Sequence, residues 1–472
     1  MMAILKESLI YRFFAAIGRW FGRQWQASRI VRAFLGTGDS EEIAGKSIFY
    51  PVGRWIRNII SAVYDKLRLK SVFTGSFLMN PFLWAAAAMV LAPIVPTLLL
   101  VGLVLASGIT FIVDTASDRQ RRLVSSAVNR YVIIYAALYV AATVFSVTFS
   151  GSLYAGLLTA MFVMCVFVVE NAVKTKKQLK ILVIALVAAG VLVSLYGFYQ
   201  YIFGTGATDA WTDETMFEDI SIRVYSTLQN PNVLSEYLLL IIPIRAACVF
   251  TAKNLKTRLA SICAFGIMCV CMLMTFSRAG WLGLLVAAAV FLIMIDRRYI
   301  ILGIIGVALI FLAAPDMIIS RFASIGNMSD GSTSYRVAIW LGTLEMLKDY
   351  WICGVGPGTD AFNLIYPGYS YNAVSAQHSH NLFLQITSDA GIGALIVFIL
   401  IIIVILRTLC SAVSREKDRK SKIFQIAAVA GIVGFMVQSM AEYSFYNYRI
   451  MFLFWAYIGL GAVFARVGKL EE

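Results

Sequence analysis

Long apolar runs, separated by short polar segments, occupy most of the chain after residue 76. A helix needs about 20 predominantly apolar residues to cross the hydrocarbon core of a membrane. The runs predict twelve membrane-spanning helices, near residues 78–92, 95–113, 131–148, 152–169, 181–203, 232–249, 259–276, 281–295, 299–314, 391–406, 423–441 and 450–465. We therefore expect an all-α protein, a polytopic transmembrane bundle of about 12 helices.

Residues 1–76 have a different pattern from the rest of the chain. Two stretches, 9–32 and 55–69, mix Arg with Trp and Phe at helical spacing and are too short or too polar to span a membrane. Such helices lie in the membrane interface, with Arg and Lys towards anionic headgroups. We expect 1–76 to be a cytoplasmic, basic, amphipathic interfacial segment with a linker at 36–45, and we see no cleavable signal peptide.

The longest polar interruption is 315–390, which we expect to be a large extracytoplasmic loop with helices. It separates a first transmembrane block, 77–314, from a last block with a cytoplasmic tail, 391–472. Residues 334–350 predict an amphipathic helix in this loop. Its apolar face would consist of Val337, Trp340, Leu341, Leu344 and Leu347. The N-cap candidates are Ser332, Thr333 and Ser334.

Composition supports the membrane assignment. The chain is 60% hydrophobic and 14% charged, whereas soluble domains are about 45–50% apolar and about 25% charged. The net charge of +14 does not indicate a nucleic-acid partner, because Lys and Arg lie between apolar runs, where positive charge orients the chain. With the amino terminus inside, only six of the 40 Lys and Arg lie outside: Arg223, Arg278, Arg321, Arg336, Lys348 and Arg449. We expect a multi-pass inner-membrane protein with both termini cytoplasmic.

The two histidines of the chain, His378 and His380, stand together at the end of the large outer loop. Histidine accepts a proton near neutral pH and suits general-base catalysis. The alternative is that the two histidines lie in a loop at the membrane interface and have no functional role. A metal site would need three or four ligands, and no cysteine or acidic cluster stands nearby. We therefore expect neither a metal nor a cofactor.

Outer arginines add a second chemical signal. Arg278 lies between two apolar spans with almost no loop, where a charge is costly, although an arginine at a helix end can also extend to the headgroups. Arg223 precedes an Asn-Pro-Asn segment, and Arg336 begins the outer helix. A guanidinium matches phosphate oxygens bidentately, so the three predict binding of an anionic lipid-linked group. Gly354–Gly358 is expected to be a tight turn.

These segments together resemble the bacterial O-antigen ligase and O-antigen polymerase superfamily. The resemblance covers roughly residues 80–465 and rests on Ser277 to Gly283, which is similar to the SRxxWLG segment of that family, and on the blocks around Arg223, Arg336, Gly354–Gly358, His378–Gln385 and Gly391. It implies a GT-C glycosyltransferase, inverting and metal-independent, that takes glycan from a polyprenyl diphosphate carrier at the outer membrane face. It implies binding of the lipid diphosphate by Arg223 and Arg278 and catalysis by His380. Possible secondary residues are His378, Asn381 and Arg336.

The expected function is therefore transfer or polymerisation of glycan, with a surface polysaccharide polymerase favoured over a ligase because nothing indicates a lipopolysaccharide acceptor. Expected partners are a polyprenyl-diphosphate-linked oligosaccharide donor, a glycan or lipid acceptor, membrane lipids and other envelope-polysaccharide assembly proteins, but no nucleic acid. The alternative is a secondary transporter or exporter of a cell-envelope precursor. Transporters place ionisable groups near the bilayer midplane, whereas here the polar groups gather outside.

Overall fold

The computed structural model of the chain describes residues 49–66, 77–117, 123–205, 222–313, 315–327 and 330–471. Within these ranges the regular structure is helical, without strands, which confirms the all-α prediction. The α-helices are α5 (Phe49–Lys66), α7 (Pro81–Leu91), α8 (Thr97–Ser117), α9 (Asn129–Val144), α10 (Phe149–Ala172), α11 (Lys176–Ile202), α12 (Pro231–Thr251), α13 (Leu255–Met274), α14 (Arg278–Ile295), α15 (Tyr299–Ala313), α16 (Asp316–Ala323), α17 (Gly331–Tyr350), α18 (Thr359–Ile365), α19 (Leu382–Arg415), α20 (Arg419–Gln438) and α21 (Tyr448–Ala465).

In the described part of the chain, nine helices are long and apolar enough to cross a membrane: α8, α10, α11, α12, α13, α14, α19, α20 and α21. Three further apolar helices, α7, α9 and α15, are shorter. Each of the twelve predicted spans coincides with one of these helices. The polytopic bundle is therefore confirmed, and the count of twelve spans stays a prediction.

Small residues bring α14 and α20 into close contact. A Cβ atom added to Gly283 of α14 would lie 2.7 Å from the carbonyl oxygen of Gly434 in α20, and one added to Gly434 would lie 2.8 Å from that of Gly283. Between helices in lipid, van der Waals packing of this kind replaces the hydrophobic effect as the driving force. Helices α12, α20 and α21 are mostly buried and form the centre, whereas less than a third of α8, α13 and α14 is buried, so these helices lie nearer the periphery.

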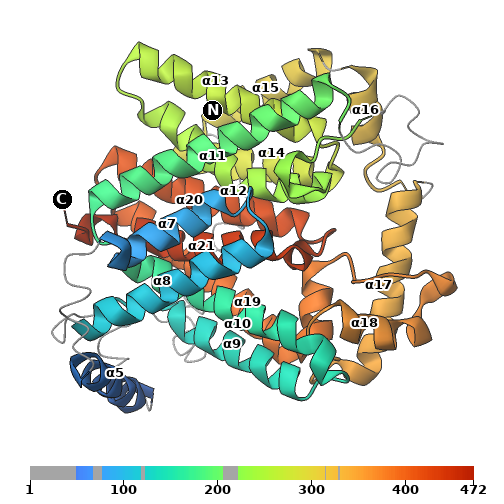
Figure 1. The fold of residues 1–472 in the computed structure, drawn as a ribbon. Coiled ribbons are helices and arrows are strands. Elements are labelled where there is room, and N and C mark those ends of the chain that lie inside the picture. Colours follow the sequence, from blue (N-terminus) through green and yellow to red (C-terminus); the bar gives the residue numbers. More distant parts are fainter. Residues whose placement is uncertain are drawn as a thin grey trace, which may run out of the picture.

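The two ends of the bundle differ. Helices α17 and α18 lie together on one side, and α5 lies on the opposite side with the carboxyl terminus (Figure 1). One face of α5 exposes Trp55, Ile59 and Val63, as expected for an interfacial helix, and its placement in a membrane interface stays a prediction. The other predicted interfacial stretch, 9–32, and the linker at 36–45 lie outside the described residues.

Helix α17 confirms the helix predicted at 334–350 but corrects its details, and its place outside the membrane stays a prediction. Its N-cap is Asp330, whose side chain accepts a hydrogen bond from the backbone N–H of Thr333, so the predicted Ser/Thr caps were wrong. The predicted apolar face is buried only in part, because Leu341 and Leu344 are exposed. The helix packs instead through small positions such as Gly342, whose Cβ would lie 3.0 Å from the Tyr366 ring. Apolar periodicity identifies this helix but does not identify the side of the helix that packs.

Helix α19 is broken at Ala390 and Gly391, which coincides with the predicted boundary between loop and span. Two carbonyl groups freed by the break accept hydrogen bonds from the Gly354–Gly358 turn: Val355 N–H donates to Ser388 O at 2.6 Å, and Gly356 N–H to Asp389 O at 3.2 Å. These N–H groups therefore hold the broken helix. Beyond the break α19 continues to Arg415, and only residues 416–418 lie between α19 and α20. The segment 407–422, between the predicted spans 391–406 and 423–441, is therefore largely helical.

Candidate active site

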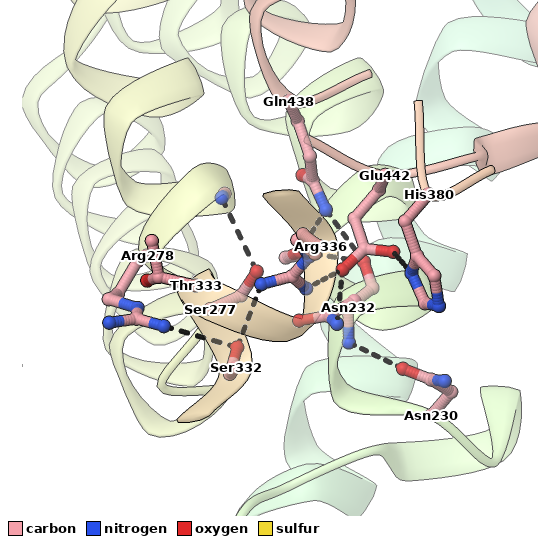
Figure 2. Close-up of polar contacts among 12 residues, drawn as sticks. Asn230, Asn232, Ser277, Arg278, Ser332, Thr333, Arg336, His380, Gln438 and Glu442 are labelled. Carbon is pink, nitrogen blue, oxygen red and sulfur yellow. Dashed lines mark hydrogen bonds and ion pairs between the residues drawn. The ribbon is translucent and has the colours of Figure 1, made fainter. Parts of the chain in front are cut away.

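A continuous polar network lies on the α17 side of the bundle (Figure 2). It joins helix ends that are far apart in the sequence. Arg278 begins α14, Arg336 lies in α17, His380 precedes α19, and Glu442 follows α20. Because each of these side chains lies at or near a helix end, the packing of the bundle sets their relative positions.

Glu442 connects the members of this network. Its Oε1 atom accepts hydrogen bonds from the Arg336 guanidinium and from Nδ2 of Asn232, the latter at 2.8 Å, and its Oε2 atom lies 3.3 Å from Nδ1 of His380. The side chain is buried. Burial acts to raise the pKa of Glu442, but the charge of Arg336 and the hydrogen bond with His380 outweigh it and lower the pKa to about 2. Glu442 is therefore a carboxylate at neutral pH.

The environment of His380 determines its tautomer. A carboxylate oxygen only accepts hydrogen bonds, so the contact with Glu442 places a proton on Nδ1 of His380. In the neutral ring the lone pair is then on Nε2. The backbone of His380 has a φ of 47°, and its carbonyl accepts a hydrogen bond from the Trp340 indole at 3.3 Å. One hydrogen bond to the ring and one to the backbone carbonyl thus fix the orientation of the His380 side chain, which stays partly exposed.

His378 has a different environment. Its ring stacks on Tyr446, with the centroids 5.0 Å apart, and its Nδ1 accepts a hydrogen bond from the backbone N–H of His380 at 3.3 Å. Burial, with a smaller effect from His380, lowers the pKa of His378 to about 3. A ring that resists protonation to this extent is a poor general base, and His378 instead supports the backbone of His380.

Arg278 is held at the start of α14, where Ser277 caps the helix by accepting from Gly280 N–H. Its guanidinium makes a bidentate contact with the Asp330 carboxylate, at 2.8 and 2.9 Å, and its side chain is 9% exposed. It therefore does not extend into solvent, as the alternative considered from the sequence would require. Ser332 Oγ accepts from both Arg278, at 3.1 Å, and Arg336, at 2.9 Å, and so links Arg278 to the Glu442 contacts.

Arg223 joins the network from the segment between α11 and α12. It donates from Nε to the carbonyl of Thr275 at 3.0 Å and from Nη2 to Oδ1 of Asn232 at 3.3 Å. Asn232 in turn donates to Glu442. Burial, together with the nearby Arg321 and other arginines, lowers the pKa of Arg223 to about 9. The three residues singled out from the sequence are thus connected: Arg223, Arg278 and His380 share one network.

Asn381, a possible secondary residue, makes contacts that are structural. Its Oδ1 accepts from the backbone N–H groups of Phe383 and Leu384 and caps α19, while its Nδ2 donates to the carbonyl of Met440. It thereby fixes the loop that carries His380 against the end of α20.

Two network residues were missed from the sequence, Asp330 and Glu442. A lone acidic residue between apolar runs carries no pattern that separates it from a solvated one, and only its burial beside arginines reveals the role. The described part of the chain contains no group of three or more His, Cys, Asp and Glu that could hold a metal ion. The site can therefore offer a histidine base, a carboxylate partner and several guanidinium groups.

Part of the chain matches a known protein family. No curated protein matches the chain. Residues 263–399 match the family model described as O-antigen ligase. This segment contains Arg278, Asp330, Arg336 and His380, and it ends before Glu442. The chain, a multi-pass membrane protein, is thus similar to the O-antigen ligase family over this segment, which supports the resemblance seen in the sequence.

Proposed function

We propose that the protein is an inverting glycosyltransferase that transfers glycan from a polyprenyl diphosphate carrier to an acceptor at the outer face of the cytoplasmic membrane. The observation that supports this proposal most directly is the His380–Glu442 pair, joined through Arg336 and Ser332 to the Arg278 guanidinium. A proton acceptor and phosphate-binding groups are the two requirements of such a transfer. The sorting of Lys and Arg along the sequence supports a cytoplasmic location for both termini.

The arginines act on the leaving group. When the glycosidic bond to the carrier breaks, its electron pair goes to the diphosphate oxygen, where negative charge develops. Arg223 and Arg278 lie in a buried region, where a positioned donor stabilises developing charge more strongly than in water. Removing one such donor typically costs about 2.7–4 kcal/mol of transition-state stabilisation.

His380 acts on the acceptor. The lone pair on Nε2 takes the proton of the acceptor hydroxyl as its oxygen forms a bond to the anomeric carbon, from the side opposite the departing diphosphate. The configuration at that carbon inverts. Glu442 stabilises the resulting imidazolium through Nδ1. General-base catalysis of this kind contributes about 10²–10⁴-fold in rate, and no metal ion takes part in any step.

We favour a polymerase, in which the acceptor is itself a lipid-linked glycan, over a ligase. Purified protein in liposomes, supplied with a synthetic polyprenyl-diphosphate-linked oligosaccharide, should yield longer glycans and free polyprenyl diphosphate. Transfer only when a lipopolysaccharide core is added would indicate a ligase. Movement of the donor across sealed liposomes without a new glycosidic bond would overturn the proposal and support the exporter alternative.

Variants test the assigned roles in the same assay. His380→Ala should abolish transfer while donor still binds. Arg278→Ala should raise KM for the donor, and Arg278→Lys should restore function only in part, because lysine lacks the planar fork. His378→Ala should be milder than His380→Ala, since His378 supports the backbone. Near-normal turnover of His380→Ala would end the general-base assignment.

A further inference from the structure

Arg278 shares its carboxylate partner with a second buried arginine. Arg321, near the end of α16, has its Nη1 atom 3.6 Å from Oδ2 of Asp330, and both side chains are almost completely buried. Arg278 contacts the two oxygens of the same carboxylate. One small anionic group therefore lies between two guanidinium groups, at the site where the donor diphosphate is proposed to bind.

Four arginines lie close together at this site. We call Arg223, Arg278, Arg321 and Arg336 the arginine cluster. In the part of the chain that the structure describes, Asp330 pairs with Arg278 and Arg321, and Glu442 pairs with Arg336. The arginines act on one another: after burial itself, the charges of Arg321 and Arg336 are the main causes that lower the pKa of Arg223. Such a concentration of positive charge attracts an anionic ligand.

A diphosphate linked to lipid and sugar carries one negative charge on each phosphate, so it is an anion of the kind that the arginine cluster attracts. Carboxylate and phosphate also present the same paired oxygens to a guanidinium fork. We propose that Asp330 occupies the place of one donor phosphate between Arg278 and Arg321 and gives way to it, so that Arg321 is a further diphosphate-binding residue. This inference rests on the proposed function and extends it to a competition between an internal carboxylate and the donor.

A purely structural role for Asp330 is the rival explanation, because this residue also caps α17. Its Oδ1 accepts from Thr333 N–H at 3.0 Å. Asparagine is as good an N-cap as aspartate, so Asp330→Asn keeps the cap and removes the charge. The two explanations then predict opposite signs. If the Asp330 carboxylate is only structural, its removal should lower the affinity for the donor. If it competes with the donor, its removal should raise that affinity.

The test compares variants in liposomes, with donor KM and inhibition by inorganic pyrophosphate as readouts. For Asp330→Asn we expect both the donor KM and the inhibition constant to fall by about fivefold or more. For Arg321→Gln we expect both to rise by a similar factor. Asp349→Asn is the matched control, because it removes one negative charge from the exposed end of α17, where Asp349 contacts Tyr369, and it should change neither constant.

Failure of the inference and failure of the proposed function give different results. If wild-type protein transfers glycan but Asp330→Asn binds donor and pyrophosphate no better, the internal competition is wrong and the function stands. Normal constants for a folded Arg321→Gln would likewise remove Arg321 from the site. If wild-type protein neither transfers glycan nor binds donor, the proposed function itself fails. Thermal unfolding of each variant in detergent identifies misfolding, and Asp330→Ser, which also supplies a cap, replaces an unfolded Asp330→Asn.

Discussion

Replacing Glu442 with Gln should remove transfer activity while leaving the fold in place. The two side chains have nearly the same shape, and Glu442 is buried. Its Oε1 atom faces two donors, the Arg336 guanidinium and the Asn232 amide. In the variant, the amide oxygen must take that position, because an NH₂ group there would oppose two N–H donors. The amide NH₂ group then faces Nδ1 of His380.

This exchange reverses the tautomer of His380. An NH₂ group donates, so Nδ1 of His380 must accept, and the proton moves to Nε2. Nε2 then has no lone pair for the acceptor hydroxyl. We expect kcat to fall by about 10²–10⁴-fold, the range that general-base catalysis contributes, which equals about 2.7–5.4 kcal/mol at 1.36 kcal/mol for each factor of ten. The carboxylate-to-amide exchange in serine-protease triads acts through the same wrong tautomer.

The effect on stability should be much smaller than the effect on turnover. Removing one partner of a buried ion pair costs about 3–5 kcal/mol. Here the amide oxygen still accepts from Arg336, whose side chain is 20% exposed and keeps part of its hydration, so we expect a cost near that of one altered hydrogen bond, about 1–2 kcal/mol. Thermal unfolding of purified protein measures this cost.

The assay is glycan transfer in liposomes, with donor binding measured separately. Donor KM should not rise in Glu442→Gln, because the substitution removes a negative charge beside the arginine cluster. Glu345→Gln is the matched control, since Glu345 lies on the exposed side of α17 in a pair with Lys348, and it should retain full activity. A kcat for Glu442→Gln within about threefold of wild type would refute the tautomer argument, because it would show that catalysis does not need the lone pair on Nε2.

Three further predictions concern the fold, the topology and the chemistry. Gly391→Ala should lower stability by about 3 kcal/mol or more, because φ is 77° and the new Cβ would lie 1.9 Å from Ile352 O; Gly393→Ala, with nothing within 4 Å, is its control, and equal melting temperatures would contradict the break in α19. Two variants with a single cysteine each test the topology. A membrane-impermeant maleimide added from outside should label the variant that keeps the exposed Cys353 and should not label the variant that carries Ser414→Cys. The reverse labelling would invert the topology. Chelators should leave transfer unchanged, and a loss restored by a divalent ion would contradict a metal-independent reaction.

Some features of this protein follow from its sequence alone. The long apolar runs predict membrane helices because a helix in lipid must satisfy its own backbone and expose apolar side chains, a requirement that acts locally. The span predicted from residue 391 begins where α19 is broken, at Ala390 and Gly391, although the break itself was not predicted. His380, Arg223 and Arg278 stood out because charged or titratable side chains are rare and costly in such a chain. The O-antigen ligase resemblance came from the same segments and is confirmed by the match at 263–399.

The tertiary structure decided which groups meet. Glu442 and Asp330 are separated from their partners by long stretches of chain, and no local pattern distinguishes a buried carboxylate from an exposed one. The packed side of α17 escaped prediction because the apolar Leu341 is exposed, whereas the small Gly342 lies against Tyr366. Apolar periodicity therefore identifies a helix in a membrane protein without identifying the side that packs, and the partners of its polar residues depend on that side.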